Sequence, residues 1–252
     1  MEGLSKYKKI IVAGPLVLEV VYPALNPRDS NTVRAGKKAL STEAQQRMNL
    51  KYAWQKLELE MAANFGVRDL YCTFTYDAEH LPKNRAAANR CIQSFWRKLR
   101  AARAVSEKDL VYIYNTESKH GDGRMHHHVL INSTGEDYEE IRKLWVYGNV
   151  DFVQIRIDRE KNYESLAKYL CKEQREKVGQ RLWSASRNIK KPEQECFRVD
   201  DDISIAPPPG AYVLDDSGDR VTQYGHYRYI KFLAPSWDRT KKPKTKRRRS
   251  KR

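Results

Sequence analysis

The order of the predicted strands and helices after residue 70 constrains the fold of this chain more than any other feature. Runs rich in β-branched and aromatic residues predict strands, and apolar residues at three- and four-residue steps predict helices. In chain order the prediction is a strand at Tyr71–Asp77, a helix at Lys83–Ala104, strands at Leu110–Thr116 and His126–Asn132, a helix at Glu136–Tyr147, a strand at Val150–Ile157 and a helix at Tyr163–Val178. This β-α-β-β-α-β order predicts an α+β fold of the ferredoxin-like, split βαβ kind, an antiparallel sheet with helices on one face.

Weaker patterns flank this core. A capping-box pattern and helical periodicity predict a leading helix at Ser41–Phe65, and the apolar stretch Ile10–Leu18 predicts a strand or hairpin. Segments Ala211–Asp215 and Arg220–Phe232 predict a further hairpin. We therefore divide the chain into an N-terminal strand and loop extension at 1–40, a core with its leading helix at 41–192, a C-terminal loop and hairpin extension at 193–240, and a basic tail at 241–252 that we expect to be disordered.

The charge of the chain points to a polyanionic partner. Lys and Arg number 48 and Asp and Glu 32, which gives a formal net charge of +16 in 252 residues. The tail Lys241–Arg252 has five Lys, four Arg and no acid, so it holds nine of these charges and leaves seven for the rest. Nucleic acid is the favoured partner, and a ribosome or an anionic membrane surface is the alternative. For the tail we favour non-specific DNA binding over a partner-binding arm or a solubilising end.

Composition also excludes several classes of protein. Hydrophobic residues make up 40% of the chain, which is too many for a disordered protein. Apolar runs stay well short of the roughly 18 residues that a membrane helix needs, so we expect no membrane partner. The four cysteines form no C-x-x-C pair, which argues against a zinc ribbon or a disulfide framework and favours a reduced, cytoplasmic protein.

Three consecutive histidines stand at the start of a predicted central strand. Alternate residues of a strand share a face, so His126 and His128 point one way and His127 the other. Two imidazoles at that spacing suit a pair of metal ligands, and partly exposed, hydrogen-bonded hairpin histidines are the alternative. Glu117 ends the neighbouring strand and would complete a nitrogen and oxygen triad suited to Mg²⁺ or Mn²⁺. Its alternative role is a surface ion pair with Arg124 or Lys119.

The last predicted helix carries Tyr169 and Lys172, three residues apart and so on one helix face. A tyrosine hydroxyl can attack phosphorus and form a covalent phosphotyrosine, and a lysine beside it can orient the phosphate, offset its charge or assist proton transfer. The alternative is that Tyr169 simply packs on the sheet. With 15 tyrosines in the chain, the pair has little weight in isolation.

Taken in order, the segments YCTFTYD, GRMHHHVLIN and AKYLCKE resemble the HUH endonuclease superfamily, and most of all the rolling-circle replication initiators of bacterial plasmids, integrative elements and phages. The resemblance spans roughly residues 31–192. It implies a divalent metal on His126 and His128, with His127 in the middle position that is usually hydrophobic, and Glu117 matches the third ligand. It implies Tyr169 as the nucleophile of a single-tyrosine enzyme and Lys172 as the associated lysine, with Tyr163 structural.

The resemblance implies a nicking-joining enzyme that forms a 5′-phosphotyrosine link and frees a 3′-OH to prime a host polymerase. The implied partners are single-stranded DNA at a replication origin and, indirectly, the polymerase and helicase of a bacterial host cell, in whose cytoplasm the protein would act. The oligomeric state is left open. We expect DNA contacts from four basic residues, whose alternative role is a solvated surface: Arg97, Arg124, Arg187 and Lys190.

Three other functions fit the same sequence. A relaxase or single-strand transposase would use the same chemistry in a different biological role. A non-enzymatic, RNA-binding ferredoxin-like module would leave the histidines incidental, although such modules display stacked aromatic residues on the sheet. A metal-dependent hydrolase would act without a covalent link to Tyr169.

Overall fold

A computed structural model describes residues 6–23, 42–105, 107–118, 124–155, 163–172, 181–199, 205–222 and 225–235. The predicted core is present and its α+β, ferredoxin-like class is confirmed. In chain order it contains β3 (Leu70–Phe74), α2 (Arg85–Val105), β4 (Tyr112–Glu117), β5 (His126–Ile131), α3 (Asp137–Leu144) and β6 (Val150–Gln154). The strands lie in the order β6-β3-β5-β4 and all neighbours are antiparallel, so β5 lies in the centre of the sheet. A two-residue strand, β7 (Ser184–Ala185), extends the edge beyond β4.

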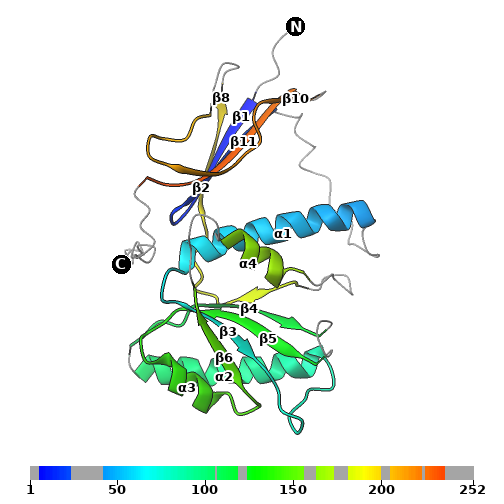
Figure 1. Cartoon of the computed structure of the whole chain (residues 1–252), viewed down its shortest axis with the longest axis vertical. Coiled ribbons are helices and arrows are strands. Elements are labelled where there is room, and N and C mark those ends of the chain that lie inside the picture. The colour runs from blue at the N-terminus through cyan, green and yellow to red at the C-terminus, as the bar shows by residue number, and fades with distance from the viewer. Residues whose placement is uncertain are drawn as a thin grey trace, which may run out of the picture.

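Helices cover both faces of this sheet. As predicted for the split βαβ unit, α2 and α3 pack together on one face through a core that includes Phe74, Phe95 and Trp145. Two further helices, α1 (Glu43–Asn64) and α4 (Tyr163–Leu170), lie on the opposite face (Figure 1). Helix α4 was expected to continue to Val178, but it ends at Leu170, and residues 173–180 lie outside the described residues.

The two ends of the chain form a second antiparallel sheet. Its strands are β1 (Lys6–Ala13), β2 (Leu16–Pro23), β8 (Glu193–Val199), β9 (Tyr212–Asp216), β10 (Arg220–Thr222) and β11 (Gly225–Leu233). The main order is β10-β11-β2-β1-β8, and β9 pairs with β11. The expected N-terminal hairpin is therefore β1–β2, and the C-terminal strands join it in one sheet. The basic tail at 241–252 lies outside the described residues.

Figure 1 shows the resulting layers: the second sheet, then α1 and α4, then the core sheet, then α2 and α3. The apolar cluster that joins the upper three layers includes Leu16 and Leu233 from the second sheet, Leu57 and Met61 from α1, and Leu170 from α4. Among the described helices, none combines the length and apolar character needed to span a membrane.

Gly148 closes the turn between α3 and β6 against the end of β3. A Cβ atom at this position would lie 2.4 Å from the carbonyl oxygen of Thr75 and 2.7 Å from the backbone nitrogen of Asp77. The close approach allows two backbone bonds, from Thr75 N to Asn149 O at 2.9 Å and from Asp77 N to Tyr147 O at 3.0 Å. A side chain at 148 would therefore push this turn away from β3.

We predict that Gly148→Ala lowers the free energy of unfolding by about 3 kcal/mol, because rigid backbone atoms must move to admit the methyl group. Urea denaturation measures the change. The matched control is Gly218→Ala, where φ is +61° and no atom lies within 4 Å of the added Cβ, so that only about 1 kcal/mol of backbone strain is expected there. Equal losses in the two variants would contradict the steric argument.

A buried lysine joins the second sheet to both helices beneath it. Lys231 of β11 is 2% exposed, and its Nζ lies 2.9 Å from Glu58 Oε1 of α1. The same ammonium group contacts the carboxylate of Glu164 in the first turn of α4. Burial raises the pKa of the Glu58 carboxyl although Lys231 opposes the shift. The position of α4 is therefore tied to a strand more than sixty residues further along the chain.

We predict that Lys231→Ala lowers the free energy of unfolding by about 3–5 kcal/mol near neutral pH, because a buried carboxylate loses its partner. The raised pKa of Glu58 sets the sign of the pH dependence. A carboxyl whose pKa rises on folding contributes stability when protonated, and this contribution is lost as pH increases through the folded pKa. The defect should therefore be smaller at mildly acidic than at mildly alkaline pH, as measured by urea denaturation.

Lys143→Ala, which removes an exposed lysine from α3, is the control and should change stability little at either pH. A defect of Lys231→Ala that grows as the pH falls would contradict the buried-carboxylate account.

Candidate metal centre and the tyrosine beside it

Two neighbouring strands bring a carboxylate and two imidazoles together on one face of the core sheet. Glu117, the last residue of β4, is the cross-strand partner of His126, the first residue of β5. Directly paired residues of an antiparallel ladder point to the same side, and His128 shares that side because it lies two residues along β5. This is the face covered by α4 (Figure 1). The register thus follows from the ladder of β4 and β5.

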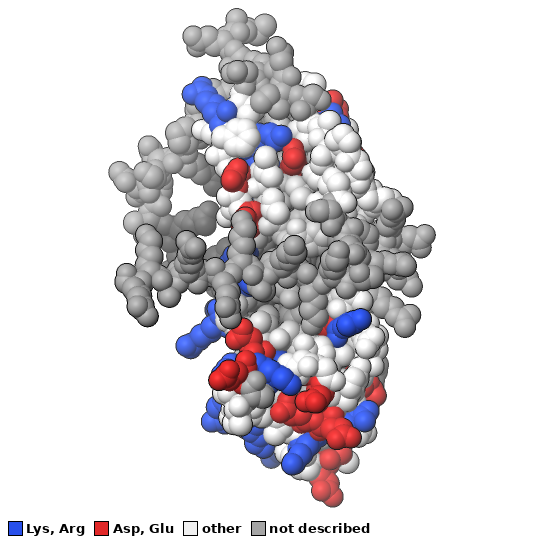
Figure 2. All heavy atoms as spheres, turned by 90° about the vertical axis from the view of Figure 1, so that its left-hand side faces the viewer, with Lys and Arg blue, Asp and Glu red and all other residues white. Residues whose placement is uncertain are grey.

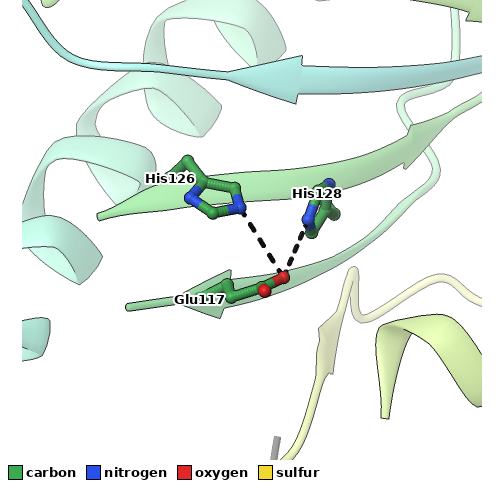
Figure 3. A group of neighbouring side chains, drawn as sticks. All are labelled: Glu117, His126 and His128. Atoms are coloured by element: carbon green, nitrogen blue, oxygen red, sulfur yellow. Dashed lines mark hydrogen bonds and ion pairs between the residues drawn. The ribbon is translucent and has the colours of Figure 1, made fainter. Parts of the chain in front are cut away.

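The three side chains converge on one point (Figure 3). Glu117 Oε2 lies 2.9 Å from His128 Nε2 and 3.6 Å from His126 Nε2. One ligand atom from each residue lies within 4.8 Å of the others, and Glu117 and His128 are buried. Two imidazole nitrogens and a carboxylate oxygen at these separations fit a divalent cation with open positions for other ligands. This group could therefore bind a metal ion.

The environment keeps these ligands in the protonation states that a metal needs. Burial, and then the nearby His126, lower the pKa of His128 to about 4, so its imidazole is neutral at physiological pH. Burial alone would raise the pKa of Glu117, but the hydrogen bond from Lys172 and the positive charge at His128 and Lys172 hold it below its usual value. A neutral imidazole and an ionised carboxylate are the metal-binding forms of both groups.

The second shell contains a residue that the sequence patterns missed. The hydroxyl of Tyr71 lies 2.7 Å from His128 Nδ1. Tyr71 is on β3, the other neighbour of β5, and lies on the same face as His128 because its ladder partner is Leu130. A metal-binding histidine usually has its second ring nitrogen held in this way. A tyrosine two residues before the cross-strand partner of the histidine, Thr73, was the available signal.

His127 points to the other face and is structural. It is fully buried, with Nε2 2.7 Å from the Tyr76 hydroxyl and Nδ1 3.0 Å from the Thr116 hydroxyl. Burial lowers its pKa to about 3. Because both ring nitrogens have hydroxyl partners on this side, the side chain is held away from the Glu117 face. The middle histidine therefore takes the place of a hydrophobic residue.

Tyr169 and Lys172 lie at the end of α4 beside the triad. The Tyr169 hydroxyl is 3.3 Å from His128 Nε2, and the side chain is 42% exposed. Lys172 Nζ lies 2.8 Å from Glu117 Oε1 and 3.8 Å from the centre of the Tyr169 ring. Lys172 follows the helix in a turn closed by a bond from its backbone nitrogen to Tyr169 O. The expected pair thus meets the triad, although only Tyr169 is helical.

The four expected DNA contacts are not gathered in one place. Arg124 is next to the triad: its carbonyl oxygen lies 3.1 Å from His126 Nδ1, and its guanidinium donates to Tyr76 O at 2.9 Å. Arg97 is exposed on α2, which covers the opposite face of the sheet. Arg187 is exposed after β7, and the backbone of Lys190 bonds to Asn64 at the end of α1. Only Arg124 therefore lies beside the metal centre.

We predict that Tyr71→Phe weakens Mn²⁺ binding about tenfold, the usual size of a second-shell effect, because His128 loses its orienting partner. His128→Ala should weaken binding further, since a ligand is removed. Isothermal titration of the folded variants with MnCl₂ measures both. Tyr138→Phe, an exposed tyrosine of α3, is the control. Unchanged affinity in either test variant would contradict this assignment of ligands.

Comparison with known proteins places this site inside a recognised family region. Residues 69–174 match a family model whose description is replication-associated protein, of the ORF2 and gene 2 protein type. The matched region contains β3 to α4, and with them Glu117, His126, His128, Tyr169 and Lys172. No significant match was found among curated proteins or among solved structures. The family match supports a replication initiator protein with a role in the initiation of DNA replication.

Proposed function

We propose that the protein is an HUH-type, metal-dependent DNA endonuclease and strand transferase that nicks and rejoins one strand at a replication origin. The observation that carries the proposal is the position of the Tyr169 hydroxyl, 3.3 Å from a nitrogen of the candidate metal ligand His128. A nucleophile and a metal-held phosphate must lie within a few ångströms of each other for attack on phosphorus. The match to a replication-associated family over residues 69–174 supports the same role.

Glu117, His126 and His128 would hold the divalent ion, for which the chemistry of the donors favours Mg²⁺ or Mn²⁺. Such an ion, when bound, supplies charge neutralisation at a non-bridging phosphate oxygen. Lys172 and the Tyr169 hydroxyl share one side of the triad, so the lysine ammonium can contact the same phosphate. Exposure of Tyr169 leaves its hydroxyl accessible to a DNA strand.

In the proposed reaction the Tyr169 oxygen forms a bond to phosphorus and loses its proton to solvent or to a neighbouring base. The bond from phosphorus to the 3′-oxygen breaks, and this oxygen takes a proton and leaves as a 3′-OH. The product is a 5′-phosphotyrosine on Tyr169 and a free 3′-OH that a polymerase can extend. Attack by a 3′-OH on the phosphotyrosine reverses the step without ATP, which is how the strand is rejoined.

Surface charge supports an approach of DNA from the end of the sheet that holds the site. The face shown in Figure 2, which carries α3 in its lower half, has acidic and basic side chains intermixed. Helix α3 itself begins with Asp137, Glu139 and Glu140. Arg124 and Lys172 instead lie beside the triad. A DNA backbone is attracted to the second location and finds no uniform basic surface at the first.

The decisive test is a covalent adduct that survives denaturation. A pool of randomised single-stranded oligonucleotides, labelled at the 3′ end, is incubated with the protein and Mn²⁺ and separated by denaturing electrophoresis. Labelled protein is expected from the 3′-labelled pool. A 5′-labelled pool should give a shortened free strand and no labelled protein, because the 5′-phosphate stays on Tyr169.

Tyr169→Phe should abolish the adduct, and Tyr138→Phe, on α3, should retain it. An adduct that persists in Tyr169→Phe would refute the assignment of the nucleophile. Label transferred from the 5′-labelled pool would refute the polarity of the link. Absence of any adduct, with tight DNA binding retained, would favour a non-enzymatic DNA-binding protein.

A further inference from the structure

A polar pocket of about 290 Å³ opens beside the metal centre, where β7 stops pairing with β4. The ladder joins Ser184 to Tyr114 and Ala185 to Ile113. Before this pair, residues 181–183 line the pocket together with Asn115 and Thr116 of β4. Arg85 and Asn89, from the first turns of α2, complete the lining.

The pocket and the metal centre share structural elements. Thr116 directly precedes Glu117 in β4, and its hydroxyl bonds to Asn89 Oδ1 at 3.0 Å. Asn115 Nδ2 donates to the carbonyl oxygen of Leu170 at 2.5 Å, and Leu170 is next to Tyr169. The start of α2, the end of β4 and the end of α4 lie at one end of the core sheet, on the right in Figure 1. A ligand in the pocket would thus be adjacent to the reacting groups.

The lining has the chemistry of a nucleotide site. Arg85 and Arg181 supply two guanidinium groups and no acidic residue lines the pocket, which favours a phosphate. Trp183 supplies an aromatic ring of the kind that stacks on a base. Asn115 is 3% exposed, and its Oδ1 has no hydrogen-bond partner among the described residues. A buried acceptor of this kind is costly unless a ligand brings a donor.

We propose that this pocket binds one nucleotide of the single DNA strand next to the scissile phosphate, an inference that rests on the proposed function. Arg85 and Arg181 contact its phosphate, and Trp183 stacks on its base. Asn115 Oδ1 accepts from an exocyclic amino group, so the pocket prefers a base that carries one to thymine. The volume is at the low end of small-molecule pockets, about 300–1,000 Å³, and suits a single nucleotide.

The test measures where and how tightly DNA binds without added metal, so that cleavage does not consume the probe. Fluorescence anisotropy with labelled oligo(dC) and oligo(dT) gives the affinities. We expect tighter binding of oligo(dC), and about a tenfold loss for Arg181→Ala, as for the loss of a charged hydrogen bond. Arg142→Ala, which removes an exposed arginine from α3, should leave the affinity unchanged.

A second measurement locates the base directly. Oligo(dC) with one 5-iodocytosine is cross-linked by ultraviolet light and the modified peptide is identified by mass spectrometry. Cross-linking to Trp183 is expected in the wild type and in Tyr169→Phe. Cross-links elsewhere only, with Arg181→Ala binding like the wild type, would overturn the proposal. So would equal binding of the two oligonucleotides, or a deoxynucleoside monophosphate that binds the pocket without competition from oligo(dC).

These results separate the two levels of the account. A Tyr169 adduct with no effect of the pocket variants would refute the nucleotide pocket and leave the nicking activity. Binding that depends on Arg181 and cross-links to Trp183, without any Tyr169 adduct, would support the pocket and refute the nicking activity.

Discussion

The hydrogen bonds at the two ring nitrogens of His128 hold the interaction on which the rest of the site depends. Nδ1 meets the Tyr71 hydroxyl at 2.7 Å, and Nε2 lies 2.9 Å from Glu117 and 3.3 Å from Tyr169. These contacts join β3, β4, β5 and α4 at one imidazole. When Nδ1 carries the ring proton and donates it to Tyr71, the lone pair of Nε2 is directed to the centre of the triad. A buried ring of low pKa suits this role, because a protonated imidazole cannot bind a cation.

The layered architecture explains how an eight-residue helix can hold a nucleophile in place. Helix α4 is short, and isolated helices of that length are not stable in water. It is instead enclosed between the core sheet below and the second sheet above (Figure 1). Its first turn is bound through Glu164 to the buried Lys231, and its last carbonyl accepts from Asn115. The terminal strands therefore stabilise the position of Tyr169, although they lie outside the region that matches the family model.

The sequence predicted the core well because its elements show clear periodicity and local turn signals. The alternation around His126–His128 placed His127 on the opposite face, as the ladder of β4 and β5 shows. The sequence did not predict that the two ends of the chain share one sheet, because pairing of β2 with β11 joins residues about two hundred positions apart and leaves no local pattern. Tyr71, Asn115 and Arg181 were missed for the same reason. Their roles come from neighbours on other strands and helices, and a strand pattern shows only the face of a residue.

The central claim is that Glu117, His126 and His128 hold a divalent cation beneath the Tyr169 hydroxyl. A crystal soaked in Mn²⁺, with anomalous diffraction recorded at the manganese absorption edge, tests it most directly. The account predicts an anomalous peak between the carboxylate of Glu117 and the two Nε2 atoms, with the Tyr169 hydroxyl facing it and Nδ1 of His128 still bonded to Tyr71. Absence of a peak at this position, or a peak only at other residues, would contradict the account.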